Sequence, residues 1–506
     1  MELWSNIVEG FSGLLGIDTI IILCLAIVIG LVGGIIPGIS GPMLVVVFLP
    51  VTFAMEPHQA FVLLSVLYVT SVYGGMVTAI LFRAPGSPES AVTALDGYAM
   101  REKGLAGRAL GIGILSSGVG ALVATVAMIL LTAPLATLAL SFSSAEFFAI
   151  SVLGLSIVAS LSSGKVAKGI FGVGMGMLLA TVGTDPMTSE ARFAFGSAGL
   201  AAGLALVPVM IGLFAIPEVL RKSRLENKPK KEDPAANKIE ILSRDNIREA
   251  GPTAARSSVV GVLLGLLPGA GSITASVLGY SQAVKFAKDK SQFGKGDPRG
   301  VAGPESANNA GAVGSLVPLF ALGIPGSAAT AILIGAFVLH GFQPGPNFMT
   351  NQSSIVYTVF AAIIVANLLA LVLAKPFISS VSKILRIPYS VLASVVIIFS
   401  MLGAYSMRNS IFDITIMLVF GAVGYFLLVN KFPVAPIILG FVLGPIAESH
   451  FRRALIMAGE DVFTLLSRPI AGTVIAVAVV VLLMPLLTGA YKKLRPRTGK
   501  RDPVSA

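Results

Sequence analysis

Long apolar runs constrain this chain more than any other feature of its sequence. Three of them, at 20–36, 355–374 and 471–487, hold roughly 17 to 20 residues each, enough to cross a hydrocarbon core of about 30 Å as helices. Hydrophobic residues make up 55% of the chain and charged residues 12%, whereas soluble domains average about 25% charged residues. The runs lack the alternation of outer-membrane barrel strands. We therefore predict an all-α polytopic membrane protein.

Glycine and proline are frequent inside these runs. The chain holds 55 glycines and 29 prolines but a single cysteine, Cys24. In lipid, backbone groups freed by a helix break are tolerated only where they are buried in protein or line a wet cavity. We therefore expect discontinuous helices, and neither a disulfide framework nor a cysteine-rich metal site.

Charge and composition divide the chain into five segments. Ten Lys and Arg lie between Arg221 and Arg256, and six lie between Lys492 and Arg501. Basic stretches beside membrane spans are typical cytoplasmic anchors, so we prefer this interpretation of the net charge of +11 to nucleic-acid binding. The predicted segments are an amphipathic interfacial helix at 1–18, a first membrane repeat at 19–219, a cytoplasmic basic linker at 220–256, a second membrane repeat at 257–490 and a cytoplasmic basic tail at 491–506.

Three sequence patterns occur once in each membrane half, in the same order. The first is G-x-x-x-G-x-x-P-G, the second is Pro-Gly-Ser, and the third is a proline that opens a short amphipathic stretch. Their spacings between the halves are 231, 240 and 242 residues, and three ordered matches predict an internal repeat. The members are Gly30, Gly34, Pro37 and Gly38 with Gly261, Gly265, Pro268 and Gly269; Pro85, Gly86 and Ser87 with Pro325, Gly326 and Ser327; and Pro134 with Pro376.

The loops that follow these motifs carry opposite charge signatures in the two halves. Residues 50–60 hold no Lys or Arg, but the corresponding stretch 285–299 holds five. After the second motif, residues 101–108 hold three, and their counterpart at 340–352 holds none. Basic loops stay in the cytoplasm. The two halves are therefore predicted to be inverted relative to each other, as in many secondary transporters.

The second-half motif lies between two basic residues that are too close for two membrane crossings. Only 28 residues separate Arg256 from Lys285, with Pro268 and Gly269 near the middle. A helical leg of about 12 residues rises roughly 18 Å, which is short of the bilayer. We therefore predict a re-entrant hairpin with its tip near the midplane, and a counterpart at the first-half motif that enters from the other side.

Helix breaks at this depth suit an anion. Unpaired N–H groups and the positive end of the helix dipole can hold a carboxylate without a buried cationic side chain, while hydroxyl and carbonyl oxygens can bind sodium. Small residues at such spacing also serve in ordinary helix packing, but for the Pro-Gly and Asn-Asn neighbourhoods together we prefer the functional interpretation. The predicted substrate-binding residues are Gly38, Ser40, Gly41, Gly86, Ser87, Ser90, Gly269, Gly271, Ser272, Asn308, Asn309, Gly326 and Ser327, and sodium sites are expected near Ser40, Ser87, Asn308, Asn309 and Thr330.

A few ionisable residues lie close to the breaks. Glu89 and Glu305 each precede a serine and are either cation ligands or proton carriers, or helix-start carboxylates that bind their own amides. Asp96 is predicted to be a turn or cap at the cytoplasmic end. Arg83 either faces the substrate or, as we prefer, anchors the chain at the interface. Metal-binding histidine spacing, catalytic motifs and phosphate-binding loops are absent from the sequence, so an enzyme is not expected.

These motifs together resemble one transporter family. The stretches GLVGGIIPGISGPM, APGSPESAVTALDGYAM, GLLPGAGS, GPESANNA and LGIPGSAAT are similar to the large membrane subunit of the tripartite tricarboxylate transporter family. The resemblance implies two partners, a small four-helix membrane subunit and a periplasmic solute-binding protein, and a location in the bacterial inner membrane. It also implies an elevator-like fold with a scaffold and a mobile transport domain. One departure is Arg83, where the family more often has a small or polar residue.

The predicted function is import of citrate or another di- or tricarboxylate by symport with Na⁺ or H⁺, with no further cofactor. The alternative is a channel-like permease or an exchanger for another organic anion, built on the same repeat. An intramembrane enzyme or an assembly scaffold fits less well, because the sequence offers no catalytic dyad. Each of these interpretations is compatible with a homo-oligomer.

Overall fold

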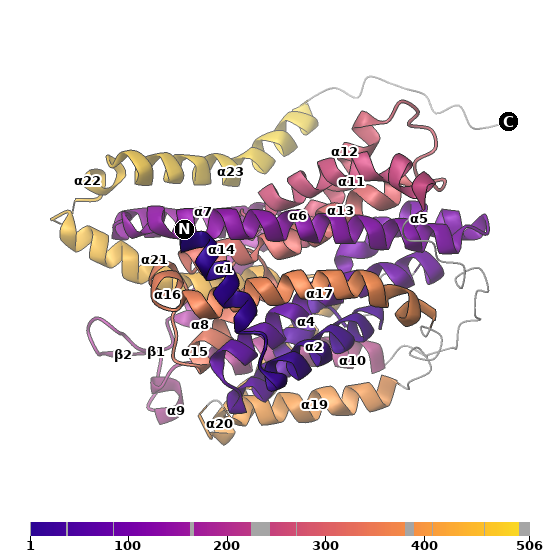
Figure 1. The fold of residues 1–506 in the computed structure, drawn as a ribbon. Coiled ribbons are helices and arrows are strands. Elements are labelled where there is room, and N and C mark those ends of the chain that lie inside the picture. Colours follow the sequence, from indigo (N-terminus) through magenta and orange to yellow (C-terminus); the bar gives the residue numbers. More distant parts are fainter. Residues whose placement is uncertain are drawn as a thin grey trace.

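The structure, a computed structural model, is helical over most of its length (Figure 1). It describes residues 2–36, 39–83, 86–161, 166–223, 243–269, 271–379, 389–406, 408–459 and 461–494. Five helices within these ranges are long and apolar enough to cross a membrane. The chain is therefore mostly helical, with several apolar helices as predicted for a polytopic membrane protein, and it departs from the all-α prediction in one short β-hairpin.

The first half of the chain contributes most of the central helices and one small β-hairpin. In the hairpin, β1 and β2 pair antiparallel, with Gly183 opposite Arg192. In chain order the elements are α1 (Glu2–Ser12), α2 (Ile17–Ile35), α3 (Gly41–Phe48), η1 (Leu49–Ala54), α4 (Pro57–Phe82), η2 (Pro88–Ala91), α5 (Thr93–Glu102), α6 (Ala106–Leu140), α7 (Ser144–Leu161), α8 (Val166–Ala180), β1 (Gly183–Thr184), β2 (Ala191–Arg192), α9 (Ala198–Ala201) and α10 (Leu206–Ser223).

The second half consists of helices only, within its described residues. Helix α11 has 22 residues and begins at Arg244, so it extends beyond the predicted membrane leg of about 12 residues into polar residues that had been assigned to the linker. The elements are α11 (Arg244–Gly265), α12 (Gly271–Phe286), α13 (Arg299–Gly314), α14 (Leu316–Leu322), α15 (Ala328–Leu339), α16 (Pro346–Asn351), α17 (Ser353–Ser379), α19 (Tyr389–Ser406), α20 (Ile411–Val429), α21 (Ala435–Met457), α22 (Val462–Leu466) and α23 (Pro469–Leu494).

Helix α4 forms the centre of the molecule, and every residue from Ala60 to Leu81 is buried. Helix α2 approaches it closely because glycines stand at the crossing. A Cβ added at Gly30 would lie 1.9 Å from the Thr70 Oγ1, and one added at Gly34 would lie 2.0 Å from the Ser71 carbonyl oxygen. Any side chain at these two positions would force the helices apart.

The same packing recurs between α11 and α13 in the second half. A Cβ added at Gly261 would lie 2.3 Å from the Ala307 carbonyl oxygen, and one added at Gly265 would lie 2.8 Å from the Gly311 carbonyl oxygen. These two glycines are the second-half members of the repeated motif. On α13, Ala307 lies 237 residues after Thr70 of α4, and Gly311 lies 240 residues after Ser71. The motif therefore has the same packing role in both halves.

The helices that precede the two Pro-Gly-Ser motifs also end alike. Arg83 caps α4 with a φ of 53°, and Gly323 caps α14 with a φ of 72°, both in the left-handed region. Their N–H groups donate to the carbonyl oxygens of Ala79 and Leu319, at 3.2 and 3.0 Å. A residue with a Cβ is disfavoured there by roughly 1–2 kcal/mol. Arg83 is therefore a strained position whose second-half counterpart is glycine.

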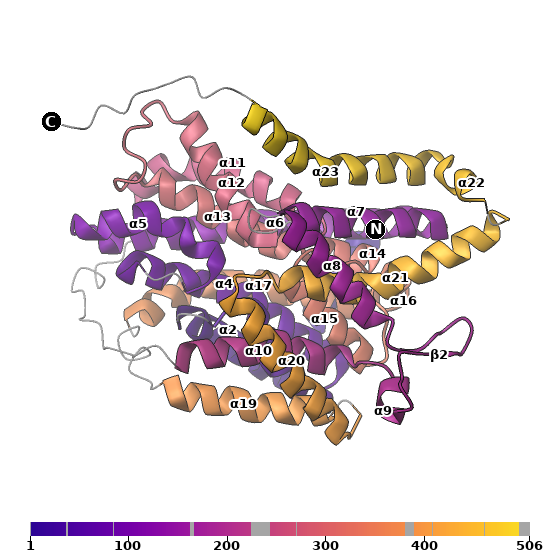
Figure 2. The same ribbon diagram turned by 180° about the vertical axis from the view of Figure 1, so that it is seen from behind.

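Two pairs of crossed helices stand beside this core (Figure 2): α8 packs on α21, and α10 packs on α20. Glycines again allow the approach. A Cβ added at Gly176 would lie 1.9 Å from the Ile437 carbonyl oxygen, and one added at Gly212 would lie 2.5 Å from the Met417 carbonyl oxygen. Because each pair joins one helix from each half, the two halves interlock.

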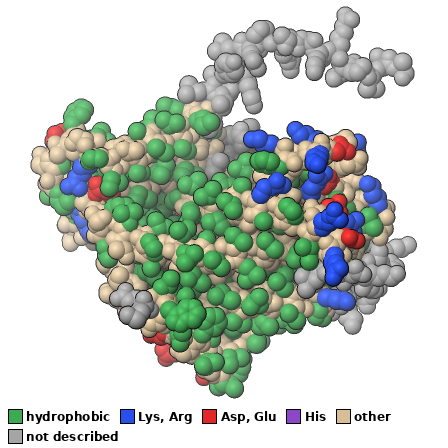
Figure 3. Space-filling model, turned by 45° about the horizontal axis from the view of Figure 1, so that its top comes forward, with side chains coloured by type: hydrophobic (Ala, Val, Ile, Leu, Met, Phe, Trp, Pro, Cys, Tyr) green, Lys and Arg blue, Asp and Glu red, His purple; other side chains and the backbone are tan. Residues whose placement is uncertain are grey.

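The surface separates a broad apolar area from a cationic end. Figure 3 shows hydrophobic side chains over most of one face and Lys and Arg gathered at the end where Figure 1 shows α5. Leu178, Val372 and Phe426 are 60–71% exposed, as expected for side chains that face lipid. The cationic end matches the side predicted to be cytoplasmic.

Candidate functional site

Four hydroxyl groups meet in the interior of the molecule. The Tyr68 hydroxyl of α4 lies 3.3 Å from the Ser327 Oγ and 3.5 Å from the Oγ atoms of both Ser272 and Ser315. The Oγ atoms of Ser315 and Ser327 are 3.2 Å apart. All four residues are buried. We call this group the hydroxyl cluster.

Chain breaks bring three of these serines together. Ser272 lies in the first turn of α12, and Ser315 stands between the end of α13 and the start of α14. Ser327 is the N-cap of α15: its Oγ accepts the Thr330 N–H, and the Thr330 Oγ1 accepts the Ser327 N–H. The cluster is therefore formed where two helices, α12 and α15, present their N-terminal ends.

A hydrogen bond between the two second-half motifs joins these breaks. The Gly269 N–H donates to the Gly326 carbonyl oxygen at 3.0 Å. Gly269 has a φ of 78°, and a Cβ there would lie 1.9 Å from the Val158 side chain, so only glycine fits this turn. Gly271 has a φ of 62° and faces open space. The two predicted motifs of the second half are thus in direct contact.

The first-half motif forms a similar pair of hydroxyls. The Oγ atoms of Ser87 and Ser90 are 3.3 Å apart, as those of Ser327 and Thr330 are 3.2 Å apart. The Gly86 N–H donates to the Gly75 carbonyl oxygen at 3.1 Å. Because Gly75 has no side chain, this motif can lie directly against α4.

Glu305 carries a completely buried carboxyl group in α13. It is 0% exposed and accepts hydrogen bonds from the Thr93 Oγ1 at 2.5 Å and the Ser117 Oγ at 3.2 Å. It forms no ion pair with Lys, Arg or His among the described residues. Glu305 lies well inside α13 and binds other segments, so the interpretation as a helix-start carboxylate is wrong for this residue.

Two asparagines follow Glu305 on the same helix face. Asn308 is 0% exposed, and neither its Nδ2 nor its Oδ1 has a hydrogen-bond partner within the described structure. The Asn309 Nδ2 donates to the Glu305 carbonyl oxygen at 3.0 Å, while its Oδ1 is also unpartnered. A buried polar group left without a partner costs about 1–3 kcal/mol. This face of α13 therefore offers oxygen and amide groups suited to a ligand.

The polar contacts cross between the two halves. Tyr68 of the first half reaches serines of the second, and Glu305 of the second half reaches Thr93 and Ser117 of the first. The Ser276 Oγ of α12 likewise donates to the Glu89 carbonyl oxygen at 2.7 Å. Both polar groups therefore need both halves to form.

Asp96 adds a further connection between the halves. Its carboxylate accepts the N–H groups of Gly296 and Asp297, at 2.8 and 2.9 Å, and the Tyr280 hydroxyl at 2.9 Å. Asp96 was predicted to be a turn or cap at the cytoplasmic end, and the backbone groups that it binds belong to a loop of the second half rather than to its own segment.

Other predicted site residues lie apart from the cluster or outside the described residues. Ser40 is the N-cap of α3 but makes no side-chain cap hydrogen bond. A Cβ added at Gly41 would lie 2.7 Å from the Ser71 Oγ, so this glycine borders α4. The Arg83 guanidinium lies 5.6 Å from the centre of the Tyr98 ring, and this position favours the anchoring role. Gly38 lies outside the described residues.

Tyr68, Ser315 and Ser117 are polar residues of the site that the sequence analysis missed. Tyr68 and Ser117 lie within long apolar helices, where the hydrophobic pattern alone suggests core positions. A signal was available for Tyr68, because a buried tyrosine hydroxyl usually finds a partner. Ser315 lies 240 residues after Gly75, which is also the spacing between the two Pro-Gly-Ser motifs. The repeat could therefore have identified Ser315 as the counterpart of Gly75.

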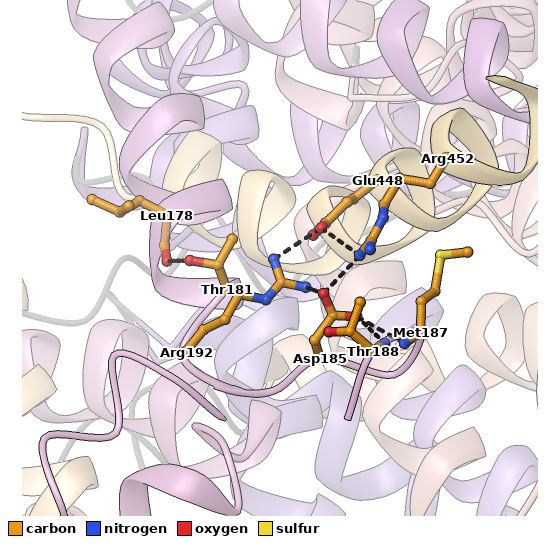
Figure 4. A network of polar contacts seen from close by, with 8 residues as sticks. All are labelled: Leu178, Thr181, Asp185, Met187, Thr188, Arg192, Glu448 and Arg452. Atoms are coloured by element: carbon orange, nitrogen blue, oxygen red, sulfur yellow. Dashed lines mark hydrogen bonds and ion pairs between the residues drawn. The ribbon is translucent and has the colours of Figure 1, made fainter. Parts of the chain in front are cut away.

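A separate ion-pair network lies beside the β-hairpin (Figure 4). The Asp185 carboxylate contacts Arg452 of α21 at 2.7 Å and Arg192 of β2 at 2.8 Å, and Arg192 also contacts Glu448 at 2.8 Å. Hydrogen bonds from the Met187 N–H and from Arg452, together with the positive charge of Arg192, lower the pKa of Asp185 below its ordinary range. The network ties the hairpin to α21, away from the hydroxyl cluster.

The model of the tripartite tricarboxylate transporter TctA family matches residues 20–439. An uncharacterized 52.8 kDa protein in the TAR-I ttuC' 3' region of Agrobacterium vitis is 37% identical over 494 residues, which cover 97% of this chain and 98% of that protein. An uncharacterized protein in the TAR-II ttuC' 3' region of the same organism is 41% identical over 233 residues, covering 46% of this chain and 96% of that protein. No solved structure matches the chain.

Proposed function

Because the chain belongs to the tripartite tricarboxylate transporter TctA family, we propose that it is the large transmembrane subunit of a binding-protein-dependent secondary transporter. It imports a di- or tricarboxylate together with Na⁺ or H⁺. Its partners are a small four-helix membrane subunit and a periplasmic solute-binding protein, and it works in the bacterial inner membrane, alone or as a homo-oligomer.

The observation that carries this proposal is the meeting of two helix N-termini at the hydroxyl cluster. Helices α12 and α15 start at Gly271 and Ala328, and Ser272 and Ser327 at these starts lie 3.5 and 3.3 Å from the Tyr68 hydroxyl. Free N–H groups and dipoles at helix starts stabilise a negative charge, and the hydroxyls can donate to carboxylate oxygens. A carboxylate at this point needs no buried Lys or Arg.

The coupling cation is proposed to bind along α13. Glu305, Asn308 and Asn309 supply a carboxylate and two amide oxygens on one helix face, and the Asn308 amide lacks partners in the described structure. Hard cations such as Na⁺ prefer oxygen ligands of this kind. A buried carboxylate without a cationic neighbour is neutralised by a bound cation or by a proton.

The transport cycle is proposed to rely on an inverted repeat with an elevator-like mobile domain. The recurrence of the glycine contacts in α2–α4 and in α11–α13 supports the repeat. The opposite charges of residues 50–60 and 285–299 support the inversion. Helices α8, α10, α20 and α21 then belong to the scaffold, and the motif-bearing helices belong to the mobile domain.

The test is uptake of radiolabelled citrate, succinate and tartrate into proteoliposomes that contain this subunit, its small partner and the loaded binding protein. Uphill accumulation that requires a Na⁺ or H⁺ gradient is expected. Accumulation that persists after both gradients are collapsed would contradict symport, and equilibration without accumulation would favour the channel-like alternative.

A pair of serine variants tests the position of the carboxylate. Ser327→Ala removes one donor, and a hydrogen bond to a charged group is worth about 1.5–3 kcal/mol, so uptake at low substrate should fall roughly 10- to 100-fold. Ser281→Ala is the matched control, because Ser281 lies on the exposed side of α12 and, among the described residues, its side chain bonds only the Val277 carbonyl oxygen. Equal uptake by the two variants would remove Ser327 from the site.

A further inference from the structure

A large pocket lies at the end of the molecule opposite the cationic end. It encloses about 990 Å³ between the end of α6, the start of α7, α15, α21 and the loop 341–347. Its walls are mostly apolar, with polar groups from Gln343, Asn347, Ser449, His450 and Arg453. We call this space the outer vestibule.

The vestibule reaches the break that precedes the second Pro-Gly-Ser motif. Leu322 and Gly323 belong to its lining, and Gly326 follows three residues later. The loop closes tightly on this point, since a Cβ added at Gly323 would lie 2.5 Å from the Pro344 carbonyl oxygen. The vestibule therefore adjoins the chain segment that leads into the hydroxyl cluster.

The charge of the vestibule is positive. Arg453 is the one Lys, Arg, Asp or Glu in the described lining, and it forms no ion pair within the described parts of the chain. Its neighbour Arg452 is instead bound to Asp185 at 2.7 Å and to Glu448 at 3.4 Å. The two arginines thus differ in role: Arg452 anchors the β-hairpin, and the exposed Arg453 presents an unpaired charge at the vestibule.

His450 supplies a second polar group without a protein partner. Its ring stacks on Phe147 with 5.0 Å between ring centres, and its buried Nδ1 has no hydrogen-bond partner in the described structure. A polar atom in this state is available to a ligand in the vestibule.

We propose that the outer vestibule is an anion-collecting site where a di- or tricarboxylate binds on its way to the hydroxyl cluster, with Arg453 as its cationic contact. The inference rests on the proposed function. Because the hydroxyl cluster contains no Lys or Arg, it attracts an anion only at short range. An unpaired arginine beside low-dielectric walls raises the local concentration of anions.

The experiment measures the charge of the vestibule directly and does not depend on transport. The chain has one cysteine, so a Cys24→Ala background with Gln343→Cys carries a single thiol in the vestibule lining. Reaction rates are measured with an anionic sulfonatoethyl and a cationic trimethylammonioethyl methanethiosulfonate. Relative to the rates of the same two reagents with a free thiol in solution, the anionic reagent should be favoured in this background. Arg453→Gln should lower the anionic-to-cationic rate ratio at least threefold, and Arg453→Lys should preserve it.

Two controls separate local charge from general disturbance. Phe195→Cys replaces a residue that is 86% exposed outside the vestibule, and its rate ratio should not respond to Arg453→Gln. Asn347→Asp adds a negative charge to the lining without touching Arg453 and should lower the rate ratio of the thiol at position 343 by a similar factor. If Arg453→Gln misfolds, this second variant still tests the electrostatic claim.

Protection of the thiol by a bound carboxylate is the second test. Citrate should slow the labelling at position 343 by both reagents when Arg453 is present and fail to do so in Arg453→Gln. An unchanged rate ratio in Arg453→Gln and Asn347→Asp, or the absence of protection by citrate with Arg453 in place, would overturn the proposal. Failure of uptake in proteoliposomes would instead count against the proposed function, so the two failures are distinguishable.

Discussion

The glycine crossing of α2 and α4 allows a prediction whose size follows from the distances. Gly34→Ala would place a Cβ 2.0 Å from the Ser71 carbonyl oxygen, where an ordinary contact needs 3.4 Å or more. The helices must therefore separate by about 1.4 Å. Overpacking of this kind costs roughly 1–3 kcal/mol or more, and the separation also displaces the wall on which the first-half serines rest.

Two further glycines provide graded controls. At Gly265 the nearest atoms lie 2.8 Å from an added Cβ, so α11 and α13 need to separate by less. At Gly174, on the exposed side of α8, no atom lies within 4 Å, and alanine there gains up to about 1 kcal/mol of helix propensity. The expected order of thermal stability is Gly174→Ala at or above the parent, then Gly265→Ala, then Gly34→Ala.

The assay heats each detergent-solubilised variant and follows the remaining monodisperse protein by fluorescence-detected size-exclusion chromatography, with uptake measured in parallel. Gly34→Ala should lower the melting temperature by several degrees and abolish uptake, whereas Gly174→Ala should preserve both. Equal stability of Gly34→Ala and Gly174→Ala would refute the argument that direct backbone contact between α2 and α4 sets the fold.

Other changes test single features of the site. Glu305→Gln should leave the protein folded, because the amide can still accept from Thr93, but should remove the dependence of uptake on the cation gradient; retained dependence would exclude Glu305 as a ligand. Asn308→Ala should raise the cation concentration needed for half-maximal uptake at least tenfold, whereas Asn430→Ala, at an exposed asparagine that bonds the Phe426 carbonyl oxygen, should not. Arg83→Gly relieves the left-handed strain at φ 53°, so stability should rise by about 1 kcal/mol with uptake retained; loss of uptake would give Arg83 a substrate role. Asp185 has a depressed pKa in the folded state, so its contribution to stability is present above its ordinary pKa of about 3.9 and is lost as pH falls through the folded value; Asp185→Asn should lower the hydrogen-exchange protection factors of residues 183–192 at neutral pH and make those protection factors insensitive to acid.

The sequence predicted those parts of the site that depend on local chemistry. Glycine and proline are rare inside stable helices, so Gly269, Gly326 and the Pro-Gly-Ser motifs identified the breaks in advance, and the structure brings Gly269 and Gly326 into contact. Serines next to a break were equally visible, and Ser272 and Ser327 do meet.

The sequence could not predict side chains that act across a helix crossing. Tyr68 lies in a helix that is buried on all sides, and nothing in its neighbourhood distinguishes it from a core tyrosine until α12 and α15 are packed against it. The partners of Asp96 were missed for the same reason, since its donors lie 184 to 201 residues away in the chain. The length of α11 was underestimated because the basic residues of the loop were used to place the membrane boundary. The helix itself begins before that boundary, at Arg244.

The crossed polar contacts give the proposed symport a physical basis. Tyr68 extends from the first half to the cluster proposed for the carboxylate, and Glu305 extends from the second half to the hydroxyls beside the proposed cation site. Both residues lie on the central helices of their halves, α4 and α13, which contact each other. A ligand that shifts one of these helices therefore alters the donors available to the other ligand, and by linkage the effect on affinity is equal in both directions. Binding of the cation should consequently tighten binding of the carboxylate by the same factor as the reverse. Two calorimetric titrations of each ligand, with and without the other, should give a coupling factor above one, and a factor of one would show that the sites are independent.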